Sequence, residues 1–167
     1  MKLRRKARVI VLQVLYETDI ANHPPGEVLE RSLHAQPLPA EAEAFARSLL
    51  AGVLAHHCRL NDLIAQYAPE WPLDQMAVVD RNILRIAIYE LGAPALDTPA
   101  KVAINEAVEL AKVFGSDSSP RFVNGVLGAL VAETPHPSLG EPLQVDANTP
   151  LTPPPASIHS AAEVQEA

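Results

Sequence analysis

Three adjacent side chains, His56, His57 and Cys58, are of the types that most often bind a transition metal. Their surroundings predict a helix, in which consecutive side chains point about 100° apart. Three neighbouring residues of one helix therefore cannot converge on a single ion, and no second group of ligands in the sequence matches them. The sequence predicts no metal site and no cofactor.

Charged pairs on the predicted helices are the other candidates for chemistry. Asp80 lies near Arg81 and Arg85, and Glu106 lies near Glu109. Such groups form salt bridges within or between helices more often than the paired carboxylates of a hydrolase. The chain has no G-x-S-x-G sequence, no phosphate-binding loop and no H-E-x-x-H sequence. We therefore expect a binding module with no catalytic residue, not an enzyme.

The densest basic cluster lies within the first eight residues. Its members are Lys2, Arg4, Arg5, Lys6 and Arg8. The whole chain has a net charge of −7, so the total hides this local excess of positive charge. On a helical wheel the three arginines fall within an arc of about 100°, with the two lysines beside them.

Two further side chains extend this basic surface along the predicted helix. Gln13 shares the side of the two lysines, and Tyr16 projects away from the apolar stripe that should face the core. Guanidinium groups contact phosphates and base edges, and aromatic rings stack on bases. These residues predict RNA or DNA binding. A solvated basic terminus is the alternative that the residues alone leave open.

A second candidate surface precedes the last predicted helix. Lys112 and Arg121 flank the polar loop 115–120, which contains Ser118, and the backbone N–H groups of a helix N-terminus attract phosphate. Phe122 presents its ring if it lies at the helix edge, whereas an ordinary capped loop with Phe122 in the core is the alternative. Gly125 lies inside a helix, which indicates a close helix contact or a ligand that needs room.

Apolar residues at helical spacing predict the elements that position these surfaces. The fold class is all-α, with six or seven helices in a compact bundle. The expected ranges are 3–20, 26–35, 41–67 with a bend or break at Asn61-Asp62, 74–91 capped by Asp74, 99–114 and 119–132. Trp71 is expected as a plug between layers.

Composition limits the location and the organisation of the chain. One cysteine in 167 residues excludes a disulfide framework, and no run of about 18 apolar residues is present to span a membrane. We expect a cytoplasmic protein without a signal peptide. Residues 1–132 should form the folded domain. Residues 133–167 are rich in proline, hold five acidic residues and no Lys or Arg, and are predicted to be a disordered tail.

Four stretches of the sequence together resemble the NusB family of transcription antitermination factors. They are RRKAR…LQVLYE near the start, RNILRIAIYEL (81–91), KVAINEAVELAKVFG (101–115) and RFVNGVL (121–127). The resemblance covers about residues 3–132. It implies two small helical subdomains, pairing with NusE, which is also a small-subunit ribosomal protein, and binding to the boxA element of nascent ribosomal RNA. It also implies a place in the antitermination complex on RNA polymerase, without catalysis.

The resemblance, added to the basic surfaces, gives a set of expected contact residues. The expected RNA-binding residues are Lys2, Arg4, Arg5, Lys6, Arg8, Gln13, Lys112, Ser118, Arg121 and Phe122. Tyr16 and Glu90 match positions that face NusE. Pro120 departs from the family pattern directly before Arg121, which leaves its effect on RNA contact open.

Two alternative functions accompany this interpretation. The chain could be an accessory domain like those of ribosomal RNA cytosine methyltransferases, or a structural interaction module that has lost RNA binding. Val9, Leu12 and Leu15 form an apolar face that a homodimer or NusE could cover. The acidic tail could also compete with RNA for the basic arm.

Overall fold

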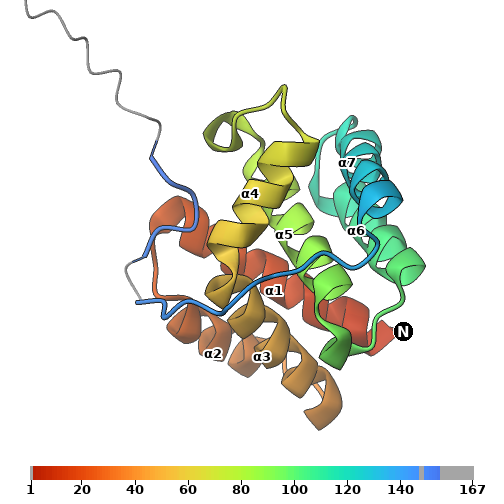
Figure 1. Cartoon of the computed structure of the whole chain (residues 1–167). Helices are drawn as coiled ribbons and strands as arrows, with labels where there is room; N and C mark the ends of the chain where they lie inside the picture. Colours follow the sequence, from red (N-terminus) through yellow and green to blue (C-terminus); the bar gives the residue numbers. More distant parts are fainter. Residues whose placement is uncertain (1, 147–148, 155–167) are drawn as a thin grey trace, which may run out of the picture.

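A computed structural model describes residues 2–146 and 149–154 (Figure 1). The helices are α1 (Lys2–Ala21), α2 (Pro25–Ala35), α3 (Ala40–Ala55), α4 (His57–Tyr67), α5 (Val78–Gly92), α6 (Ala100–Phe114) and α7 (Ser119–Glu133). Two short 3₁₀ turns, η1 (Leu73–Gln75) and η2 (Pro94–Leu96), flank α5. Within the described ranges there is no strand, so the all-α prediction is confirmed.

Prolines mark where most of these helices begin. Pro24, Pro39 and Pro99 stand at the N-cap positions of α2, α3 and α6, and Pro120 lies in the first turn of α7. The fixed φ of proline suits the first turn of a helix, and the ring blocks a helix that arrives from the N-terminal side. These residues explain why the predicted starts agree closely with the observed ones.

Helix α5 lies at the centre of the molecule (Figure 1). It packs against α1 and α3 on one side and against α6 and α7 on the other, and α4 contacts both α5 and α7. Every residue from Asp80 to Ile88 is buried. A helix surrounded in this way must bury its polar residues too, so each of them needs a partner from a neighbouring helix.

Three local expectations were wrong. The long third helix breaks at His56, whose backbone leaves the helical region, and not at Asn61. Helix α5 begins at Val78, because residues 73–75 form a separate turn after Pro72, so Asp74 is not its cap. Trp71 is 52% exposed and does not plug two layers.

The segment after α7 differs from the predicted disordered tail. Residues 134–146 and 149–154, called the strap below, lie along the bundle past the start of α4 (Figure 1). Leu139 and Leu151 are buried, and the Leu143 N–H donates to the Ala55 carbonyl at 2.9 Å. The expectation therefore needs correction for these residues. The rest of the predicted tail, 147–148 and 155–167, lies outside the described residues.

None of the helices in the described part of the chain is both long enough and apolar enough to cross a membrane. In the same part of the chain, no three His, Cys, Asp or Glu side chains lie together as a metal site would need. His56 and His57 each direct Nδ1 to a backbone carbonyl, that of Leu139 at 3.1 Å and that of Leu54 at 2.8 Å.

Candidate nucleic-acid interface

Arg8 is an internal residue of the bundle, although the helical wheel placed it on the exposed side. Its side chain is 3% exposed, and its Nε and Nη2 donate to the Glu90 carboxylate at 3.0 and 2.7 Å. The expectation of an exposed Arg8 was wrong because Glu90 of α5, Glu106 of α6 and the Phe45 ring of α3 surround its guanidinium. A wheel drawn for one helix does not show which helices lie against it.

Glu90 is buried with Arg8, at 2% exposure, and it also accepts a hydrogen bond from the Thr98 hydroxyl at 3.0 Å. The expectation that Glu90 faces a protein partner does not agree with this position. The pair satisfies both charges through a bidentate contact, which a buried guanidinium and carboxylate require.

The other two arginines of α1 are held in place and yet reach the surface. Arg5 donates through Nε and Nη2 to Glu106, both at 2.9 Å, and its side chain remains 52% exposed. The Arg5 hydrogen bonds hold the pKa of Glu106 below its usual range. Arg4 donates to the Leu96 carbonyl at 2.8 Å, and its guanidinium lies 4.5 Å from the centre of the Phe45 ring.

Arg5 meets the second predicted surface in one hollow, called the basic hollow below. Its lining residues come from α1, α6 and the start of α7: Arg5, Asn105, Glu106, Val108, Glu109, Lys112, Pro120, Arg121 and Asn124. Three cations expected from distant parts of the sequence therefore line one depression. Lys112 also pairs with Glu109 at 2.9 Å, so the salt bridges expected of Glu106 and Glu109 are present.

A second hollow, the aromatic hollow, shares Arg121 with the first. It is lined by Tyr67, Ala68, Pro69, Glu70, Trp71, Arg121, Phe122, Gly125 and Val126. A Cβ added at Gly125 would have no neighbour within 4 Å, so Gly125 is not there for a close helix contact. Tyr67 and Trp71 were not among the expected residues. The sequence signal for a binding role of Trp71 is a single Trp between two prolines, but the same pattern also predicts a residue of the core.

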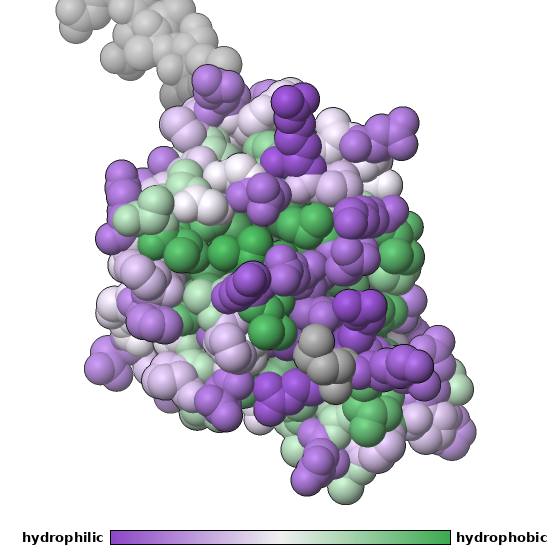
Figure 2. Space-filling model, turned by 90° about the vertical axis from the view of Figure 1, so that its right-hand side faces the viewer, coloured by the Kyte–Doolittle hydropathy of each residue, from purple (hydrophilic) through white to green (hydrophobic). Residues whose placement is uncertain are grey.

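Lys2 and Lys6 line a further hollow on the other side of Arg5, against Gln36, Pro37 and Leu38. Figure 2 shows the side of the molecule at which α1 begins. Hydrophilic side chains cover much of the middle and lower part of this face, and a hydrophobic band crosses above them. Ser118 is exposed beside the basic hollow, with its Oγ 3.2 Å from that of Ser116.

Gln13 belongs to a different place, the Tyr16 groove. This groove is lined by Leu12, Gln13, Tyr16, Glu17, Ile20, Ala21, Val79 and Phe114. Tyr16 and Phe114 are 43% and 37% exposed. By contrast, Leu12 and Leu15 are buried in the chain's own core and Val9 packs against it partly buried, so the apolar face suggested for a homodimer is largely covered.

The comparisons with known proteins bear on this arrangement. A family model described as the NusB family matches residues 5–132. The chain belongs to the NusB family. The transcription antitermination protein NusB of Roseiflexus castenholzii is 50% identical over 131 residues, which are 78% of this chain and 92% of that protein.

Solved NusB structures have the same fold. NusB of T. maritima superposes with a TM-score of 0.72 at 35% identity, over 78% of this chain and 91% of that one. A crystal structure of the antitermination factors NusB and NusE in complex with double-stranded RNA matches with a TM-score of 0.72 at 25% identity, over 80% of this chain and 98% of that one.

Proposed function

We propose that this chain is a transcription antitermination factor that binds the boxA element of nascent ribosomal RNA together with NusE. In this role it joins the antitermination complex on RNA polymerase and acts by binding, without catalysis. The observation that carries the proposal is the basic hollow, where Arg5, Lys112 and Arg121 come together from three helices. Family membership supports it.

In this proposal the two hollows bind different parts of the RNA. The cations of the basic hollow, with Lys2 and Lys6 beside it, neutralise phosphates, which supplies most of the affinity. The rings of Trp71 and Phe122 at the aromatic hollow stack on unpaired bases. Arg121 lies at the junction and contacts backbone and base together.

The Tyr16 groove is the proposed NusE surface. It is apolar, partly open and separate from the two hollows, so a protein can occupy it while RNA is bound. Tyr16 offers an exposed ring and a hydroxyl, a combination common at protein interfaces. Glu90 contributes to it only through Arg8, which fixes α1 to α5.

Fluorescence anisotropy of labelled boxA RNA, with and without NusE, tests the proposal. We expect tighter binding to boxA than to a scrambled RNA, and a further gain when NusE is added. The triple variant Lys2→Ala/Lys6→Ala/Arg121→Ala should reduce the slope of log K against log salt by about 2 on a single strand.

Two variants separate the surfaces. Arg47→Ala removes an exposed cation of α3 that pairs with Glu30 and Glu43, so RNA binding should not change. Tyr16→Ala should remove the gain from NusE and leave binding of RNA alone unchanged. Equal affinity for boxA and scrambled RNA in both conditions would contradict the proposed function.

A further inference from the structure

The strap begins just beyond the part of the chain that matches the family. The family match ends at residue 132, and α7 ends at Glu133. From Thr134 onwards the described residues have no regular secondary structure, yet they make specific contacts with α3, α4, α5 and α1. The strap is therefore held against four helices of the bundle.

The first half of the strap fits closely against α4 and the end of α5. The Ser138 carbonyl accepts from Arg59 Nε at 3.0 Å. A Cβ at Gly92 would lie 2.6 Å from the Pro137 carbonyl oxygen and 2.7 Å from the Leu139 side chain. The end of α5 therefore has room for the strap only because residue 92 is glycine.

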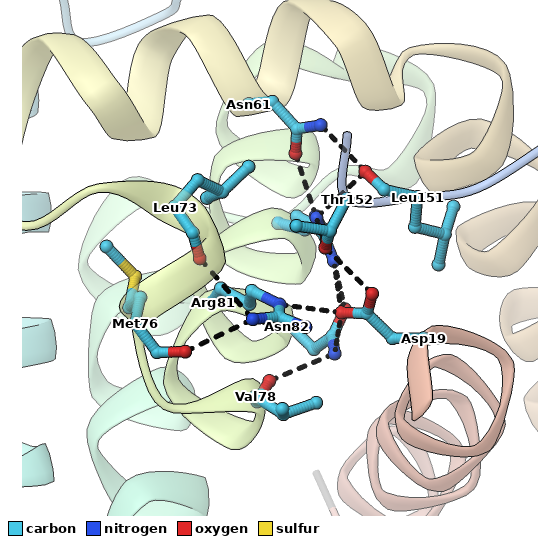
Figure 3. A network of polar contacts seen from close by, with 10 residues as sticks. Asp19, Asn61, Leu73, Met76, Val78, Arg81, Asn82, Leu151 and Thr152 are labelled. Carbon is cyan, nitrogen blue, oxygen red and sulfur yellow. Dashed lines mark hydrogen bonds and ion pairs between the residues drawn. The ribbon is translucent and has the colours of Figure 1, made fainter. Parts of the chain in front are cut away.

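The second half of the strap completes a buried polar network (Figure 3). Arg85 of α5 is 0% exposed, and its Nη2 donates to the Leu151 carbonyl at 3.0 Å and to Thr152 Oγ1 at 2.9 Å. Asn61 of α4 donates to the same Leu151 carbonyl at 2.8 Å. Without the strap, both acceptors of Nη2 would be lost, and a buried charged donor without an acceptor is costly.

The same network holds the end of α1. The Thr152 hydroxyl donates to Asp19 Oδ1 at 2.7 Å, and Asp19 Oδ2 accepts from Arg81 and Arg85 at 2.7 and 3.0 Å. Asp80, expected as the partner of these arginines, is not one of their acceptors. Ile20 and Ala21, which follow Asp19 directly, line the Tyr16 groove.

We propose that the strap is a built-in clamp that fixes the C-terminal end of α1, and with it one wall of the Tyr16 groove, against α5. The strap reaches α1 about 22 Å along the helix from Arg4, since 15 residues at about 1.5 Å each separate Arg4 from Asp19. The contact of Thr152 with Asp19 therefore lies at the opposite end of α1 from the basic arm, whereas residues 136–138 of the strap line a hollow with Glu90, the partner of Arg8.

Amide hydrogen exchange of the full-length protein tests the clamp. The Leu143 amide should exchange at least about tenfold more slowly than in an unstructured peptide, because it donates to Ala55. Thr152→Val should speed the exchange of the amides of residues 18–22 at the end of α1. Thr149→Val, the same change elsewhere in the strap, should not. Free exchange at Leu143, or equal behaviour of the two threonine variants, would overturn the proposal.

A second pair of variants measures the apolar part of the clamp. Leu151→Ala should lower Tm by at least about 5 °C, because the side chain is 2% exposed, whereas Leu143→Ala, at a residue 49% exposed, should leave it nearly unchanged. Equal Tm values for these two variants would mean that the strap lies on the surface without holding it.

Discussion

The arginines of α1 have two roles, although they are neighbours in the sequence. Arg8 is completely enclosed and pairs with Glu90, whereas Arg5 shares its guanidinium between Glu106 and solvent. The difference depends on which carboxylates α5 and α6 place beside each one. A loss of RNA binding therefore indicates a damaged fold in a variant of Arg8, and a lost contact with RNA in a variant of Arg5.

Arg8→Ala should destabilise the fold and not only weaken RNA binding. It leaves the Glu90 carboxylate buried without its cation, which costs about 3–5 kcal/mol. Lys6→Ala, at an exposed residue two positions earlier in α1, should change the free energy of unfolding by no more than about 0.5 kcal/mol. Urea unfolding followed by circular dichroism measures both, and equal stability of the two variants would contradict the buried pair.

The stability of the protein should fall in acid partly through Asp19. Burial alone would raise the pKa of Asp19, but the hydrogen bonds and charges of Arg81, Arg85 and Thr152 outweigh it and hold the pKa below its ordinary value. A lowered folded pKa gives stability that is present above the unfolded value of about 3.9 and is lost as pH falls through the folded value.

Asp19→Asn should therefore be less stable than the wild type at pH 7, and its stability should fall less between pH 5 and pH 3. Asp62→Asn is the matched control, since Asp62 is exposed on α4 and makes none of the described ion pairs. Unfolding midpoints in urea at four pH values give the comparison. A wild-type pH dependence in Asp19→Asn would show that another carboxylate controls acid unfolding.

The aromatic hollow makes its own prediction for RNA binding. Trp71→Ala and Phe122→Leu should each weaken binding of boxA RNA about 5- to 150-fold, the loss of one base stack worth about 1–3 kcal/mol. Phe114→Leu changes an exposed ring of the Tyr16 groove and should leave RNA binding alone unaltered. If these variants change the slope of log K against log salt, instead of lowering the affinity at a constant slope, the rings do not stack on bases.

At the scale of the helices, most of the fold could be predicted because the signals were local. Apolar spacing and prolines gave the extents of α1, α2, α6 and α7 within a few residues. The position of the break in the third predicted helix was missed, since contacts with Arg85 and Leu151 that no local pattern reveals keep Asn61 inside α4. The start of α5 was missed because residues 73–75 form a separate turn before it.

Packing of α3 on α5 depends on the absence of a side chain at Gly52. A Cβ there would lie 1.8 Å from the Tyr89 ring, so Gly52→Ala should destabilise the protein by about 1–3 kcal/mol. Gly128→Ala in α7 meets nothing within 4 Å and should be neutral or stabilising by up to about 1 kcal/mol. Thermal unfolding distinguishes them, and similar Tm values would contradict the close contact.

At the scale of the whole molecule, α1 connects the proposed RNA and protein surfaces. Its first turns border the basic hollow, and its later turns line the Tyr16 groove. The sequence located the cations of this site, because they are concentrated in two short stretches. It did not predict the burial of Arg8 or the position of Glu90, because these depend on helices more than 80 residues away.

The strap affects the order in which the contacts of the protein form during folding. Its bonds to Arg85 and Asp19 join residues 66 and 133 positions apart, whereas bonds within helices join close neighbours. The strap is also synthesised after α7, so its contacts with Arg85 and Asp19 form after all the residues of the helices have been added. Ribosomes add about 5–20 residues per second. Until the strap is synthesised, Arg85 lacks the two acceptors of its Nη2, so its charge is only partly compensated. The residues translated after α7 thus complete the interior of the described part of the protein.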